Sequence, residues 1–67
     1  MYETNLFKHD ELLELTLVTG NKRTGQISLQ DSWWFSAGEP MILAIREGAS
    51  SEFTYIPWRS VESYRRV

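Results

Sequence analysis

The chain has 67 residues, which is enough for one small domain and no more. It contains no cysteine, so disulfides and thiolate metal sites are excluded, and oligomerisation is the favoured source of extra buried surface. A net charge of −2 argues against phosphate-driven binding over the whole surface. Because no apolar run reaches the length of a membrane span and no signal peptide is recognisable, we expect a single cytoplasmic domain over residues 1–67 that does not bind membranes.

The hydrophobic pattern predicts a mainly all-β fold preceded by one short helix. Alternating apolar and polar residues are typical of half-buried strands, and a proline at position 57 cannot donate to a β-ladder, so it should end a strand. Short strands at close spacing indicate a small, strongly bent antiparallel barrel, with the fourth and fifth strands as open edges. The expected elements are a helix over residues 3–11 and strands over residues 12–19, 22–30, 41–46, 52–56 and 61–65.

Two glycines punctuate the first predicted hairpin. Leu13, Leu15 and Leu17 alternate with polar residues on the first strand, and the following Gly20-Asn21 pair tolerates the positive φ angles of a hairpin turn. Gly25 interrupts the second strand, which predicts a sharp bend or a β-bulge at that position.

Residues 31–40 carry serine, glycine and proline and are expected to form a loop, although they include Trp33 and Trp34. Adjacent residues of a strand face opposite sides, so one tryptophan can enter the core while the other is exposed. Both could instead pack in the core or in a subunit interface. If exposed, they offer a surface on which nucleic-acid bases stack.

Nothing in the sequence predicts catalysis. His9 is the only histidine, and it lies beside Asp10 and Glu11 with no second group to complete a pocket. The chain has no glycine-rich phosphate loop, no metal-ligand spacing and no nucleophile motif. We therefore expect a protein that is not an enzyme and that has no cofactor and no metal.

Three stretches resemble the Sm/LSm family in its bacterial Hfq branch. Residues 18–27 read V-T-G-N-K-R-T-G-Q-I, which is similar to the V-N-G-x-K-x-x-G-Q-I of that branch. Asp31-Ser32-Trp33 falls where the first Sm motif has aspartate, any residue, and an aromatic residue or histidine. Residues 56–61 resemble the second motif, in which a strand ends, turns tightly and restarts with an aliphatic residue. The resemblance implies an Sm-like (Src-homology-3-like) open barrel.

The resemblance also implies a homo-oligomeric ring of about five to seven subunits, joined by pairing the fourth strand of one subunit with the fifth strand of the next. It implies binding of single-stranded, usually uridine-rich RNA, as an RNA chaperone or post-transcriptional regulator. In such a site Trp33 would stack on a base, Ser32 would contact a base or ribose edge, and Asp31 would orient the loop. The implied RNA-binding residues are Asp31, Ser32, Trp33, Trp58, Arg59 and Lys22, and the implied interface residues are Phe53, Thr54, Tyr55, Ile56, Val61 and Ser63.

Two other functions remain open at this stage. A small barrel with Trp33, Trp34 and Trp58 lining a peptide groove would be a protein-interaction module, since aromatic grooves accept proline-rich segments. A ring without RNA binding would be an assembly scaffold. The RNA-binding function requires a stable ring in dilute solution, whereas a peptide-binding module can be a monomer.

Overall fold

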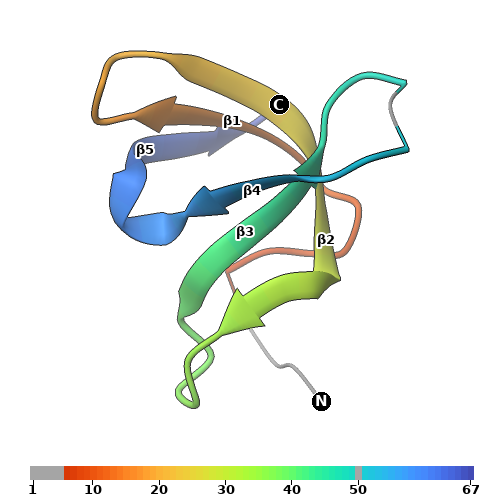
Figure 1. Cartoon of the computed structure of the whole chain (residues 1–67), viewed down its shortest axis with the longest axis vertical. Helices are drawn as coiled ribbons and strands as arrows, with labels where there is room; N and C mark the ends of the chain where they lie inside the picture. Colours follow the sequence, from red (N-terminus) through yellow and green to blue (C-terminus); the bar gives the residue numbers. More distant parts are fainter. Residues whose placement is uncertain (1–5, 50) are drawn as a thin grey trace.

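The chain folds as one antiparallel sheet of five strands, in the order β4-β3-β2-β1-β5 (Figure 1). The computed structural model describes residues 6–49 and 51–67. This architecture confirms the all-β prediction and the positions of the two edge strands, and except at the end of β2 the strand ends lie within about two residues of those expected. The elements are β1 (Leu12–Leu17), β2 (Lys22–Trp34), β3 (Pro40–Arg46), β4 (Thr54–Pro57), the 3-10 turn η1 (Trp58–Ser60) and β5 (Val61–Arg66).

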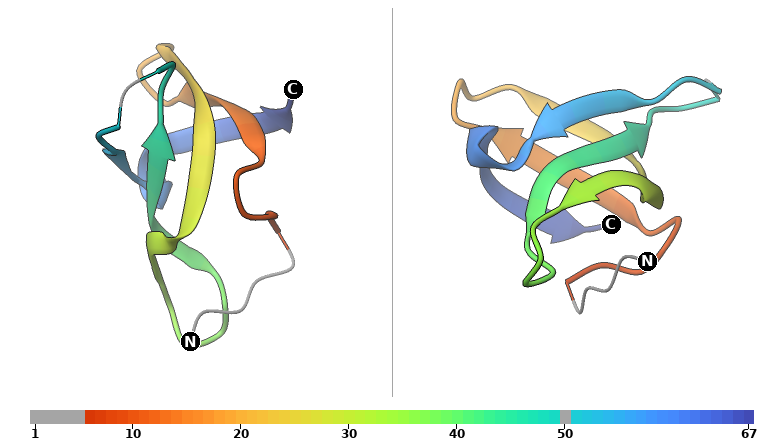
Figure 2. Two further views of the ribbon diagram at one scale, coloured as in Figure 1. Left: turned by 90° about the vertical axis from the view of Figure 1, so that its right-hand side faces the viewer. Right: turned by 60° about the horizontal axis from the view of Figure 1, so that its bottom comes forward.

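The sheet bends to enclose its own core. A single flat sheet cannot bury a cluster of side chains, but here β2 curves along its length and β1 and β5 cross β3 and β4 (Figures 1 and 2). All four strands from β1 to β4 therefore contribute to one cluster, in which several side chains are fully buried. The buried cluster comprises Phe7, Leu13, Leu15, Ile27, Leu29, Leu43, Ile45 and Ile56.

The first hairpin forms as its glycine predicts, but the second glycine has another role. Gly20 closes the turn with a φ of 92°, and its N–H donates to the carbonyl of Leu17. Gly25 pairs with Leu13 without any register shift, so there is no β-bulge against β1 at Gly25. A Cβ there would lie 2.7 Å from the carbonyl oxygen of Arg46, so glycine is needed for the close approach of β3.

β2 does not end at Gln30, and the predicted loop over residues 31–40 is wrong in its first part. The strand continues to Trp34, and only Phe35 to Glu39 turn the chain into β3. Between the pairs Ser28↔Ala44 and Trp33↔Ile42 the register shifts, because β2 there carries a bulge.

The predicted helix over residues 3–11 is not found in its described part, residues 6–11. Residues 3–5, including both proposed N-caps, lie outside the described residues. The segment pairs with β2 instead: the N–H of Asp10 donates to Ile27 O at 2.8 Å, and Ile27 N–H donates to Glu11 O at 3.0 Å. Asp10 also has a φ of 64°, which is incompatible with a continuing right-handed helix.

Candidate functional site

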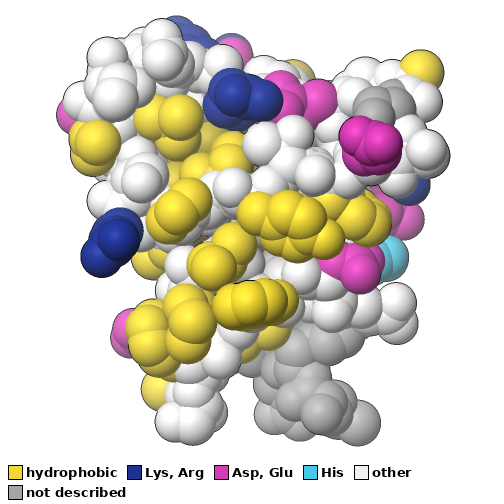
Figure 3. All heavy atoms as spheres, in the orientation of Figure 1, with side chains coloured by type: hydrophobic (Ala, Val, Ile, Leu, Met, Phe, Trp, Pro, Cys, Tyr) yellow, Lys and Arg dark blue, Asp and Glu magenta, His cyan; other side chains and the backbone are white. Residues whose placement is uncertain are grey.

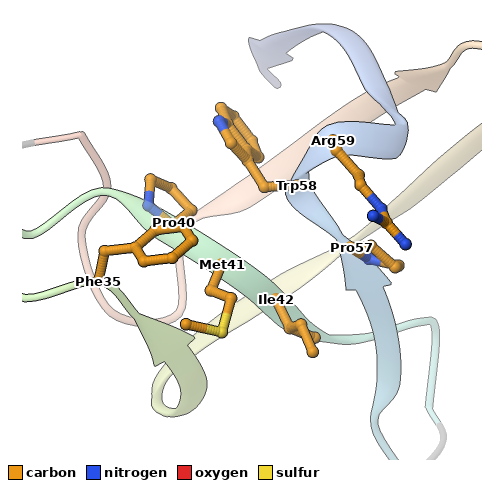
Figure 4. Close-up of a pocket in the computed structure, with 7 residues that line it drawn as sticks. All are labelled: Phe35, Pro40, Met41, Ile42, Pro57, Trp58 and Arg59. Carbon is orange, nitrogen blue, oxygen red and sulfur yellow. The ribbon is translucent and has the colours of Figure 1, made fainter.

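An apolar groove opens between the start of β3 and the junction of β4 with η1. Its volume is about 380 Å³, within the range of small-molecule sites. Figure 4 shows its lining side chains, with the guanidinium of Arg59 beside Pro57 and the ring of Phe35 at the opposite end. The lining residues are Phe35, Pro40, Met41, Ile42, Pro57, Trp58 and Arg59.

Strand register brings these residues together from three parts of the chain. Ile42 on β3 pairs with Trp33 on one side and with Pro57 on the other. Directly opposed residues of an antiparallel sheet share a face, so these three side chains form a row across the sheet. The short loop after β2, closed by Phe35 N–H donating to Glu39 O at 2.8 Å, then returns the chain through Pro40.

Large apolar side chains are exposed around the groove. Trp33 is 60% exposed, Tyr55 57% and Phe35 53%, and Met41 is also exposed. In Figure 3 hydrophobic side chains gather across the middle and lower part of the face over β3 and β4. Exposed apolar patches of this kind on small proteins mark interaction surfaces.

The two adjacent tryptophans separate as strand geometry requires. Trp34 packs against the core, and its indole N–H donates to the carbonyl of Leu29 at 3.0 Å. Trp33 faces outward beside Ile42. Because successive side chains of a strand point to opposite faces, and Trp34 is held on the core side by its hydrogen bond, Trp33 is the tryptophan that a ligand can reach.

Trp58 lies between the core and the groove. Its ring contacts Phe7 at a centroid distance of 5.9 Å and Tyr64 at 5.7 Å, so η1 is anchored to the N-terminal segment and to β5. The indole is half-buried and its remaining surface lines the groove. A fixed aromatic ring loses little conformational entropy when a ligand packs on it.

Arg59 differs from the other arginines in having no partner. Its side chain makes no hydrogen bond or ion pair with residues 6–49 or 51–67, and it is exposed at the groove. The remaining arginines are engaged by Glu47 (Arg23), Gln26 (Arg46), Glu14 (Arg65) and Glu11 (Arg66).

Two of these ion pairs shift the pKa of a carboxyl group. The hydrogen bond from Arg23 lowers the pKa of Glu47 below its ordinary value, with a further contribution from the Thr54 hydroxyl. The hydrogen bond from Arg65 likewise lowers the pKa of Glu14. These carboxylates hold Arg23 and Arg65 in the fold, and with Arg46 and Arg66 also engaged, Arg59 is the arginine without a partner among residues 6–49 and 51–67.

The structure brings together only some of the residues that the sequence assigned to RNA. Trp58 and Arg59 line the groove, and Trp33 lies beside it across Ile42. Lys22 lies at the far end of β2, paired with Thr16 of β1.

Asp31 and Ser32 lie in the bulge of β2, where their polar groups have partners. Asp31 accepts a hydrogen bond from the Ser28 hydroxyl at 2.5 Å. The buried Ser32 hydroxyl donates to Ser28 O at 2.6 Å and accepts from Ala44 N–H at 2.9 Å. In this arrangement both residues shape the strand that presents Trp33.

The residues assigned to a subunit interface lie on opposite edges of the sheet. Phe53 immediately precedes β4, Thr54 to Ile56 belong to it, and Val61 and Ser63 belong to β5. Ile56 is buried in the core and Val61 packs against it, so their side chains are already occupied. The exposed side chains of this set are Tyr55 and Ser63.

No family model, no curated protein and no solved structure matches the chain. The site must therefore be interpreted from its own geometry. Within residues 6–49 and 51–67 no group of three or more histidine or acidic side chains could hold a metal ion. Over the same residues, no helix has the length and hydrophobicity needed to cross a bilayer.

Sequence reasoning missed most of the groove. Pro40, Met41 and Ile42 were assigned only to a loop end and a central strand. Their role depends on the register that pairs Ile42 with Pro57, and no local pattern encodes that register. The run from Pro40 to Ile45 is apolar throughout, so it contains no alternation that could have marked the exposed positions.

Proposed function

We propose that the chain is an Sm-like open barrel that binds single-stranded RNA in the apolar groove. The observation that carries this proposal is the position of Arg59, an arginine without a partner among the described residues, at a groove lined by aromatic and apolar side chains. Aromatic surfaces beside a free cation suit a polymer whose bases are apolar on their faces and whose backbone is anionic.

The groove would bind a strand through two kinds of contact. Phe35, Trp58 and the neighbouring Trp33 offer ring faces on which unpaired bases stack, each worth about 1–3 kcal/mol by alanine substitution. Arg59 offers a charge-assisted hydrogen bond to a phosphate. Duplex RNA would be a poor ligand, because its bases are stacked on each other and cannot reach the rings.

The proposal includes assembly into a ring of about five to seven subunits, acting as an RNA chaperone or post-transcriptional regulator. Its support is the order of the sheet, in which β4 and β5 are both edges. Open edges are prone to pair with other strands, and β4 of one copy could pair with β5 of the next. A ring would repeat Arg59 around its axis, so an acidic chain could present a basic face.

RNA binding is tested by fluorescence anisotropy with labelled oligo-uridine and the variant Arg59→Gln. Because loss of one charged contact costs about 1.4 kcal/mol or more, affinity should fall about tenfold. Arg65→Gln is the matched control, since it removes another exposed cation, one that Glu14 already pairs. Equal affinities for the two variants would contradict a phosphate contact at Arg59.

Assembly is tested by light scattering on the protein eluting from a sizing column. Thr54→Pro removes a backbone N–H from β4. A variant that is a monomer by light scattering and still folded by circular dichroism would support edge pairing. A ring that survives this change places the interface elsewhere. If the wild type is a monomer that does not bind RNA but binds a proline-rich peptide saturably, the chain is a protein-interaction module.

A further inference from the structure

We infer that the groove binds nucleobases by their faces without reading their edges, so that it accepts single-stranded RNA and DNA of any sequence. This inference rests on the proposed function and specifies its ligand class. It differs from uridine recognition, which the sequence resemblance implies.

The first argument is the chemistry of the lining. Six of the seven lining side chains are apolar or aromatic, and the one side-chain acceptor among the seven is the weak thioether sulfur of Met41. The side-chain donors are the indole N–H of Trp58 and the guanidinium of Arg59. Uracil and adenine each present acceptors on their edges, so a single side-chain donor can bond to either base, and these two donors do not by themselves select one of them.

The second argument is that the polar side chains of the β2 bulge, which could otherwise read a base edge, already have hydrogen-bond partners within the protein. The Ser32 hydroxyl is buried and both donates and accepts within the bulge. The Asp31 carboxylate accepts from the Ser28 hydroxyl. Phe35, which follows the bulge at the end of β2, lines the groove with a ring that has no hydrogen-bonding group.

The third argument concerns the sugar. Discrimination between RNA and DNA at a site requires a polar partner for the 2′-hydroxyl. The Arg59 guanidinium is assigned to a phosphate, and apart from the Trp58 indole N–H the other lining side chains provide stacking surface. Stacking is tolerant of sequence because every base has a π-face. Purines have the larger face, so they should bind more tightly than pyrimidines.

The test is a comparison of four labelled homopolymers of equal length: oligo-rU, oligo-rA, oligo-dT and oligo-dA. The expected result is that rU and dT bind within about threefold of each other and that both adenine polymers bind more tightly. Uridine binding about tenfold or more tighter than adenine or thymidine would overturn the inference while leaving RNA binding intact. Failure of the assembled, folded protein to bind any of the four polymers would instead overturn the proposed function.

Phe35→Ala provides the second measurement, with the exposed loop change Ser36→Ala as its control. If Phe35 stacks on bases, its loss should weaken all four polymers by a similar factor, at least about fivefold. Weakening confined to the uridine polymer would show that the position reads base identity, and would also overturn the inference.

Discussion

Replacing Ser32 with alanine should destabilise the fold strongly, because its hydroxyl joins the β2 bulge to β3. The hydroxyl donates to Ser28 O at 2.6 Å and accepts from Ala44 N–H at 2.9 Å. All three residues are buried, so water cannot easily replace either bond. The change would leave one backbone donor and one backbone acceptor without partners.

The magnitude follows from these two orphaned groups. Each buried group left unsatisfied costs about 1–3 kcal/mol, and partial relaxation of the bulge brings the expected sum to about 2–4 kcal/mol. A domain of this size is stabilised by only about 3–10 kcal/mol in total. Since 1 kcal/mol corresponds to about 4–8 °C in small domains, the midpoint of thermal unfolding should fall by roughly 8–32 °C.

Thermal unfolding followed by circular dichroism at one fixed protein concentration measures this loss. Ser36→Ala is the matched control, because Ser36 is exposed in the loop after β2 and has no hydrogen-bond partner among the described residues. It should unfold within about 2 °C of the wild type. A Ser32→Ala protein as stable as this control would refute the reasoning, and would mean that the hydroxyl does not hold the bulge.

Other changes probe the remaining parts of the fold. Gly25→Ala places a Cβ 2.7 Å from the carbonyl oxygen of Arg46 and should lower the urea midpoint by the equivalent of about 1–3 kcal/mol. Because Arg23 lowers the pKa of Glu47, the unfolded state binds more protons than the folded state in acid. The stability that the Arg23–Glu47 pair contributes should therefore be complete at neutral pH and should be lost as the pH falls through the lowered pKa. The pair is partly exposed, so Glu47→Gln should flatten the pH dependence of the urea midpoint by less than about 1 kcal/mol. Trp34→Phe loses the hydrogen bond to a β2 carbonyl and should cost about 1 kcal/mol, whereas the same change at the preceding tryptophan should be neutral for stability.

The strands could be predicted because their signals are local. Alternation places Leu13 and Leu15 in the core, and both are fully buried. The turn at Gly20 was likewise predictable from turn chemistry. In each case a short stretch of sequence contains the whole physical reason for the structure.

The N-terminal segment and the bulge could not be predicted, because their causes lie elsewhere in the chain. Residues 6–11 pair with β2 instead of forming a helix. The ring of His9 also accepts a hydrogen bond from Leu29 N–H at 3.2 Å. The bulge depends on Ser32 reaching Ala44 on another strand. Local propensity is silent about such partners, so tertiary contacts decided both elements.

The candidate site divides in the same way. Arg59 and Trp58 were found from a sequence motif, and they lie together because they are neighbours on one turn. Ile42 and Met41 were missed because only the pairing of β3 with β4 brings them to that turn. A site formed across strands is determined by their register, which an isolated sequence specifies only weakly.

The bulge also explains why the exposed tryptophan can serve as a binding surface. Trp34 is held by the core and by its hydrogen bond to Leu29, and strand parity then directs Trp33 outward beside Ile42. The exposure of Trp33 is therefore imposed by a paired strand rather than by a free loop. A ligand that stacks there has little backbone to order on binding, which lowers the entropic cost of association. The residues of the bulge would thus contribute to the proposed binding through the position of Trp33, while their own polar groups remain engaged within the sheet.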